Sequence, residues 1–172
     1  MINERSANWF TGMATSTFQS LSSIDDLHHR YITAMRGAAP HANFSTLIEF
    51  QPVTETMVKN GERRGGNILG MEKLVKDGPS LMWLLSLTVD TEENQKAILP
   101  LARAFVDEIN QKQKEMGTYL DWIYLNYAWA DEQPYPHYGE ENLRLLRDVS
   151  SRYDPRGVFQ TLRSTGFKLS RA

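Results

Sequence analysis

Residues 80–89, with the sequence SLMWLLSLTV, decide the fold of this chain. A run of aliphatic and aromatic residues of this length predicts a strand that is largely buried. Asp90 or Thr91 can cap a helix directly after it, and Glu92 and Glu93 favour its first turn. The chain therefore passes from a buried strand straight into a helix.

The helix predicted after this strand is long, and it leads into another strand. Apolar residues recur at helical spacing from Ala97 to Ile109, Pro100 should kink the helix, and Gly117 ends it. Residues 119–128 then read as the last strand. This half of the chain is therefore a β-α-β unit.

The first half repeats that order. Residues 9–18 read as a strand, Ser22 or Ser23 can cap a helix that ends near Ala38, and residues 43–51 read as a second strand. Residues 52–79 lack strong periodicity and are rich in turn signals, so we expect a long loop region there.

Two β-α-β units predict an α+β fold with a ferredoxin-like βαββαβ antiparallel sheet and both helices on one face. We expect a single domain over residues 1–172. Residues 9–128 would form the sheet and its helices. Residues 129–172 would add an aromatic loop, a short helix at 140–151 and an irregular tail.

Composition excludes several function classes. The 172 residues have a net charge of −2, which gives no electrostatic reason to bind nucleic acid or acidic lipid. No apolar run is long enough to span a membrane, and no signal peptide is recognisable, so a cytoplasmic location is expected. The absence of cysteine excludes disulfides and thiolate metal sites, and the four histidines show no ligand spacing, so no metal site is expected.

Alternation along residues 119–128 places side chains on two faces of the sheet. Ile123, Leu125 and Tyr127 would pack under the helices, whereas Trp122, Tyr124 and Asn126 would share the open face. A sheet with only two helices leaves that second face to be covered by a ligand, a partner subunit or another domain. We therefore expect a homodimer or a separate domain partner there.

The same rule assigns faces to residues 80–89. Trp83 would lie on the helix face, and Ser86 would join Tyr124 on the open face. The open face would combine aromatic, aliphatic and hydroxyl groups, which suits a hydrophobic small molecule. The residues expected to line this pocket are Trp122, Tyr124, Trp83, Asn126, Ser86 and Glu49, with Trp129 as a possible lid or as loop packing.

Ordered sequence blocks carry a family resemblance over most of the chain. They are Gly65-Gly66-Asn67 with Leu69-Gly70, then Tyr124 to Ala128, then Tyr138-Gly139, then Tyr153-Asp154-Pro155 with Gly157 to Gln160, and finally Gly166 to Leu169. In this order they resemble the C-terminal substrate domain of berberine-bridge-type FAD-linked oxidases in their fungal form.

The resemblance implies roles for several residues. It implies that Tyr124 lies near the flavin and acts in proton transfer, that Asn126 approaches the flavin, and that Gly65, Gly66 and Asn67 border the substrate cavity. The family's FAD-binding domain lies upstream, and its flavin is often linked to a histidine and a cysteine. The chain would therefore hold no cofactor alone and would be a substrate half without its FAD domain.

Three functions stay open at this stage. The first is a flavin-independent cyclase, isomerase or cycloaddition catalyst of secondary metabolism, with Tyr124 and Asn126 as catalytic groups. The second is a fragment or split subunit of an FAD-dependent oxidoreductase. The third is a non-catalytic module that binds a metabolite or dimerises. The sequence identifies neither the substrate nor the product.

Overall fold

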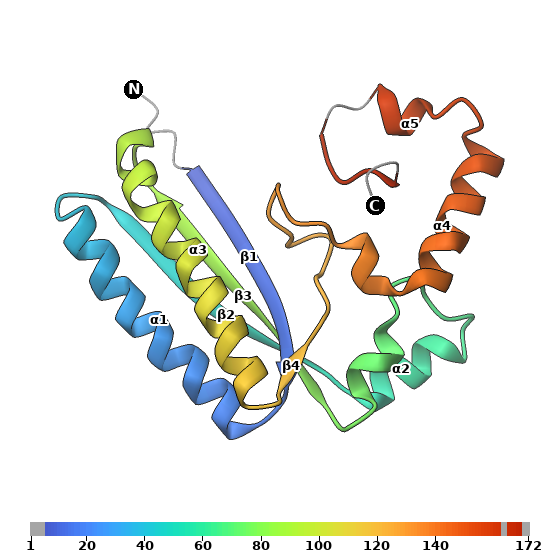
Figure 1. Cartoon of the computed structure of the whole chain (residues 1–172), viewed down its shortest axis with the longest axis horizontal. Helices are drawn as coiled ribbons and strands as arrows, with labels where there is room; N and C mark the ends of the chain where they lie inside the picture. Colours follow the sequence, from blue (N-terminus) through green and yellow to red (C-terminus); the bar gives the residue numbers. More distant parts are fainter. Residues whose placement is uncertain (1–5, 163–164, 170–172) are drawn as a thin grey trace.

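The computed structural model describes residues 6–162 and 165–169. The chain runs as β-α-β, two short helices, β-α-β and a helical C-terminal part (Figure 1). The strands are β1 (Ser6–Thr15), β2 (Phe44–Val53), β3 (Ser80–Val89) and β4 (Tyr119–Leu120). The helices are α1 (Phe18–Ala38), α2 (Glu55–Glu62), α3 (Glu92–Glu115), α4 (Glu140–Tyr153) and α5 (Val158–Thr161), with short 3-10 helices η1 (Met71–Val75) and η2 (Tyr135–Tyr138).

The strands form one antiparallel sheet in the order β2-β3-β1-β4. Helices α1 and α3 lie side by side on one face of this sheet (Figure 1). The predicted α+β, ferredoxin-like architecture with a further C-terminal helix is therefore confirmed. Strand β3 is central and pairs along its whole length with both β1 and β2.

The main core lies between the sheet and these two helices. Phe10 of β1 and Trp83 of β3 face it together with Phe105 of α3. Trp83 is fully buried, and its ring fills the space above Gly12, where a Cβ atom would come within 2.4 Å of it. Position 12 must therefore be a glycine, because any side chain there would clash with the Trp83 ring.

The first strand and helix begin earlier than the sequence predicted. Strand β1 covers residues 6–15 instead of 9–18, and α1 starts at Phe18 because the Thr17 hydroxyl accepts a 3.0 Å hydrogen bond from the backbone N–H of Ser20. The predicted cap at Ser22 or Ser23 is wrong, because both residues lie inside the helix. A threonine also caps α3, at Thr91 as predicted, and α3 continues through Pro100.

The region expected to be a loop, residues 52–79, is partly helical. Strand β2 extends through Pro52, which an edge strand tolerates because its outer side needs no donor. Helix α2 and η1 follow, and they bury Val58, Leu74 and Val75. Their apolar residues are too few to give a helical period, which is why the sequence alone did not show them.

The predicted last strand, residues 119–128, is also wrong in extent, because only Tyr119–Leu120 pairs with β1. Beyond Leu120 the backbone turns: the N–H of Trp122 donates to the carbonyl of Leu120, and that of Tyr127 donates to the carbonyl of Tyr124, both at 2.9 Å. Strict alternation therefore does not hold after residue 120.

No helix in the described part of the chain is long and apolar enough to cross a membrane.

Candidate functional site: an aromatic row on the open sheet face

One end of the open sheet face is covered by the chain itself. Met13, Val53 and Met82 project from three neighbouring strands and form a second core. The segments that cover them are α2, η1 and the turn region after β4, which contribute Val58, Leu74, Val75, Trp122 and Tyr138. Part of this sheet face, which was expected to be covered by a ligand or a partner, is thus covered by the chain itself.

Six aromatic rings follow one another across this face, and we call them the aromatic row. Tyr124 is its centre: it stacks on Trp122 with centroids 5.8 Å apart and meets Tyr127 edge-on at 5.0 Å. Tyr127 contacts Trp9 of β1 edge-on at 5.7 Å. Towards the other end, the row continues from Trp122 through Tyr138 to Tyr135.

The row is buried at Trp122 and Tyr138 and most open at Trp9. Trp122 is 3% exposed and Tyr138 2%, whereas Tyr124 and Tyr127 are half-buried and Trp9 is 44% exposed. The strand register extends the open end, because Ser86 of β3 lies between Trp9 of β1 and the exposed Leu47 of β2. An apolar molecule can therefore contact this end of the row without moving the backbone.

Polar groups meet the row at its two half-buried tyrosines. The Asn126 amide donates a 2.8 Å hydrogen bond to the Tyr124 phenol oxygen. The Gln51 amide donates to the Tyr127 phenol oxygen at 3.2 Å and to the Glu49 carboxylate at 2.5 Å. Because Asn126 uses the oxygen of Tyr124 as an acceptor, the phenol hydrogen stays free to donate to a bound molecule.

Tyr138 is the most buried ring of the row. Burial raises the pKa of Tyr138 to about 12, and its oxygen accepts a 3.1 Å hydrogen bond from the backbone N–H of Leu125. The phenol of Tyr138 is therefore a neutral structural group that fixes the turn carrying Tyr124.

The structure does not bring two predicted site residues to this face. Trp83 lies in the helix-side core against Phe105, on the opposite face of the sheet from Ser86. Trp129 stacks on Phe10 at 4.9 Å and contacts Arg103, so it also lies on the helix side. A pocket that combines Trp83 with Tyr124 and Trp122 is therefore not formed.

The glycine block lies at the edge of the covering segments. Gly65, Gly66 and Asn67 are exposed and form the turn after α2, in which the Asn67 side chain accepts a 2.9 Å hydrogen bond from the N–H of Leu69. Leu69 itself contacts the row, because its carbonyl accepts a 2.8 Å hydrogen bond from the Trp122 indole. The block thus contacts the row through Leu69.

The last blocks shape the C-terminal part. The Asp154 carboxylate accepts hydrogen bonds from the N–H groups of Val158 and Phe159, at 2.8 and 2.9 Å, and so caps α5. Gly157 takes a left-handed conformation in the same turn. In this structure Asp154 therefore has a local capping role.

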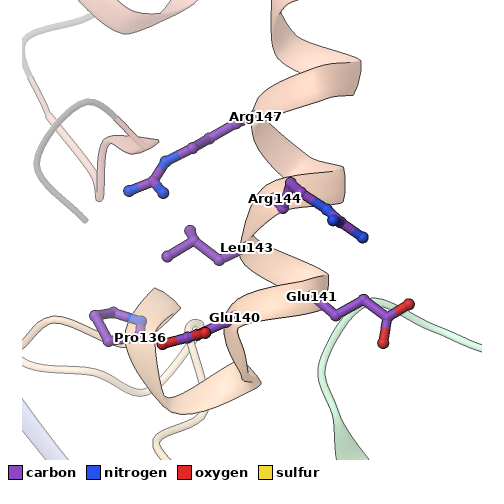
Figure 2. A pocket seen from close by; sticks show the side chains of 6 residues that line it. All are labelled: Pro136, Glu140, Glu141, Leu143, Arg144 and Arg147. Atoms are coloured by element: carbon purple, nitrogen blue, oxygen red, sulfur yellow. The ribbon is translucent and has the colours of Figure 1, made fainter.

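A large hollow of about 980 Å³ lies between η2 and α4, and no ring of the row is among the residues that line it (Figure 2). Its lining mixes Glu140 and Glu141 with Arg144 and Arg147 around Pro136 and Leu143. Charges of both signs suit neither an apolar substrate nor an anion alone. The row is the better candidate for a binding site.

The residues present fit the ring system of a flavin better than its phosphates. Trp9 and Leu47 offer an exposed apolar wall beside the half-buried ring of Tyr124, and Asn126 and Ser86 offer hydrogen bonds. The described helices give no phosphate site: threonine side chains already occupy the N-termini of α1, α2 and α3, and α4 begins with two glutamates. Among residues 6–162 and 165–169, no cluster of three or more acidic or histidine side chains could hold a metal ion.

Several fungal proteins are similar to this chain. The chain is 36% identical to the FAD-dependent monooxygenase sdcF of Emericella nidulans over 71% of its length. It is 28% identical to the FAD-dependent monooxygenase drtC of Aspergillus calidoustus over 98% of its length, and 29% identical to the bifunctional solanapyrone synthase of Alternaria solani over 85%. Homologues of this chain are thus fungal FAD-dependent monooxygenases. No protein-family model matches it, and no solved structure does.

The coverage of these relatives is partial. The matched region is 25% of sdcF, 32% of drtC and 27% of the solanapyrone synthase, so the chain spans about a quarter to a third of their length. The resemblance to FAD-linked fungal enzymes is supported. The narrower berberine-bridge assignment stays a prediction.

Two members of the row, Trp9 and Tyr127, are not predicted by the sequence as site residues. The sequence predicts Trp9 only as part of a strand and Tyr127 on the helix face, whereas it predicts Tyr135 and Tyr138, with Trp129, as a lid or as loop packing. An aromatic pair in the first strand was a usable signal for Trp9, because Trp9 and Phe10 must point to opposite faces. Nothing local signalled Tyr127, since its position depends on the turn after Leu120.

Proposed function

We propose that this chain forms the substrate-facing wall of an FAD-dependent oxidoreductase in small-molecule biosynthesis. The observation that carries the proposal is the open end of the aromatic row, in a chain similar to FAD-dependent monooxygenases. There the Tyr124 phenol keeps a free hydrogen, and Tyr127 connects its ring to the exposed Trp9. FAD, held by a part of the enzyme that these residues do not supply, would provide the redox chemistry.

The row's residues would bind and orient an apolar substrate. Trp9 and Leu47 would hold its body by contact, and aromatic faces favour flat or conjugated molecules. Ser86, between them in the register, would give one hydrogen bond of defined position. Glu49 pairs with Leu84, the next position on the same face of the sheet. Its carboxylate would favour a substrate that carries a hydrogen-bond donor.

Tyr124 would move or hold a proton. Donation from the Asn126 amide stabilises a developing phenolate, so it lowers the cost of proton transfer from Tyr124 to a substrate oxygen. Stacking on Trp122 fixes the ring orientation, and Trp122 is itself fixed by Leu69. Tyr124 and Asn126 thus form one unit in this proposal.

The test is a chimera in which this chain replaces the matched third of drtC, assayed for flavin reduction by the drtC substrate. Tyr124→Phe keeps the ring and removes the hydroxyl, and we expect a rate loss of about a hundredfold. Tyr119→Phe on β4 removes a hydroxyl outside the row, so it is the matched control and should leave the rate unchanged. Full activity of Tyr124→Phe in a chimera that holds FAD would contradict the proton-transfer role.

A flavin-independent cyclase, the first function expected from sequence, gains no support from the comparisons, because the relatives are named as FAD-dependent enzymes or as a synthase. The purified chain alone separates the two ideas. We expect it to be colourless and inactive without an FAD-binding partner. Turnover by the isolated chain would favour flavin-free chemistry instead.

A further inference from the structure

A polar contact lies beside two buried rings of the aromatic row. The Nδ1 atom of His137 in η2 lies 2.7 Å from the carboxylate of Asp121, which follows β4. Asp121 directly precedes Trp122, and His137 directly precedes Tyr138. The rings of Trp122 and Tyr138 are 6.0 Å apart. The same two segments therefore meet twice, through an aromatic contact and through a polar one.

The carboxylate of Asp121 determines which nitrogen of His137 carries a hydrogen. An ionised carboxylate only accepts hydrogen bonds, so the Nδ1 atom must donate. In the neutral ring the Nε2 atom then has no hydrogen. The contact is therefore open to both the neutral and the charged imidazole.

The backbone around Asp121 is held by the sheet. Leu120 pairs with Met13 of β1, and its carbonyl accepts a 2.9 Å hydrogen bond from the N–H of Trp122, which closes a turn around Asp121. The Tyr119 phenol also donates to the carboxylate, at 3.3 Å, a longer bond that this placement does not need. Asp121 is thus the fixed member of the pair, and His137 is the member that the contact positions.

His137 connects η2 to the rest of the cover over the sheet. Its backbone carbonyl accepts a hydrogen bond from the Lys73 ammonium of η1. The next residue, Tyr138, is 2% exposed, and its phenol oxygen accepts a 3.1 Å hydrogen bond from the backbone N–H of Leu125. Leu125 directly follows Tyr124. The position of η2 is therefore transmitted to the turn that carries Tyr124.

We infer that His137, held by Asp121, is a positioning residue for Tyr124; this rests on the proposed function, in which Tyr124 transfers a proton. A partly exposed ion pair contributes little to overall stability, so the effect lies in where the ring is held. Displacing a reacting group by about 1 Å can cost about a hundredfold in rate. The substrate contacts at Trp9 and Leu47 lie on β1 and β2, which this pair does not touch.

Amide hydrogen exchange in the full chain tests the geometry without FAD or substrate. His137→Leu removes the donor, and we expect the Leu125 N–H to exchange about tenfold faster because the turn opens more often. His137→Asn returns an N–H near the place of Nδ1 and should restore slow exchange. Asp121→Ala should match His137→Leu, and the double variant should exchange no faster than either single one. His29→Leu removes another histidine–aspartate pair, on α1, and is the control.

The drtC chimera that holds FAD tests the consequence for the reaction. His137→Leu should lower kcat about tenfold and leave KM unchanged, because only the placement of Tyr124 is disturbed. His137→Asn should restore kcat. Circular dichroism checks that each variant keeps its helices, and Asp121→Ala, at an exposed position, gives the same test should His137→Leu fail to fold.

Two results would overturn the inference. One is unchanged exchange of the Leu125 N–H in both His137→Leu and Asp121→Ala. The other is a wild-type kcat for His137→Leu in a chimera whose Tyr124→Phe variant has lost its activity. If Tyr124→Phe is fully active instead, the proposed role of Tyr124 fails, and the exchange of the Leu125 N–H alone decides whether His137 positions the turn.

Discussion

The Trp122 indole N–H donates a 2.8 Å hydrogen bond to the backbone carbonyl of Leu69. The two residues are 53 positions apart, and the bond joins the loop after α2 to the turn after β4. Trp122 is 3% exposed and stacks on Tyr124. This bond therefore connects the glycine block to the centre of the aromatic row.

Trp122→Phe should destabilise the protein. The shorter ring cannot donate, so the Leu69 carbonyl loses its partner in a buried setting, which costs about 1–3 kcal/mol. Trp129→Phe is the control, because Trp129 is held by stacking on Phe10 and a smaller ring keeps that contact. Urea unfolding followed by circular dichroism measures both. Equal losses in the two variants would show that the hydrogen bond contributes little.

Gly70→Ala should disturb the same junction. Gly70 has φ of 63°, and a Cβ atom there would lie 2.4 Å from the carbonyl oxygen of Tyr138. Both the left-handed backbone and the clash oppose a side chain, so we expect a loss of about 2 kcal/mol or more. Gly66→Ala shares the positive φ but meets no atom within 4 Å, so it isolates the backbone cost. A Gly66→Ala variant that loses as much would argue against the close approach.

The fold was predictable where the chain is strongly periodic. Residues 80–89 and the helix after Thr91 carry long apolar patterns, and both agree with the structure. The helix α2 and η1 were not predictable, because they are short and are stabilised by burial of Val58 and Leu74 on the sheet. Tertiary contact, which no local pattern encodes, decides such elements.

The site was predictable only in part. Alternation placed Trp122 and Tyr124 on the open side, and the structure does so, although through a turn instead of a strand. The same rule put Tyr127 on the wrong side, because it assumes an extended backbone. Trp83 cannot belong both to the helix-side core and to a pocket on the open face. It is fully buried in the core.

Gln113→Leu should also reduce stability. Gln113 is fully buried where α3 approaches the start of α1: its amide donates to the Ser23 hydroxyl at 3.3 Å, and its oxygen accepts a hydrogen bond from the Thr118 hydroxyl. Leucine keeps the volume but leaves Thr118 poorly paired, so we expect a loss of about 1–3 kcal/mol. Gln111→Leu, on the exposed side of the same helix, should change the free energy of unfolding by less than about 0.5 kcal/mol. Thermal and urea unfolding of both variants decide the point.

Stability should fall in mildly acidic solution through His28. Burial, and then the neighbouring charge of His29, lower the pKa of His28, while Asp25 acts in the opposite direction. The His28 ring bonds the Thr46 hydroxyl of β2 and meets Phe105 edge-on at 6.3 Å, so the neutral form fits the folded state.

The direction follows from proton uptake. With its pKa lowered on folding, His28 binds more protons in the unfolded chain than in the folded one at pH values below about 6.5. Its contribution to stability is therefore complete above that pH and is lost as the pH falls from there towards the lowered pKa. His28→Gln keeps a hydrogen-bonding side chain but cannot titrate, so its unfolding free energy should depend less on pH between 7.5 and 5.5. His29→Gln removes an exposed ring, so its unfolding free energy should keep most of the wild-type dependence on pH. If His28→Gln shows the same pH dependence as the wild type, other groups cause the acid sensitivity.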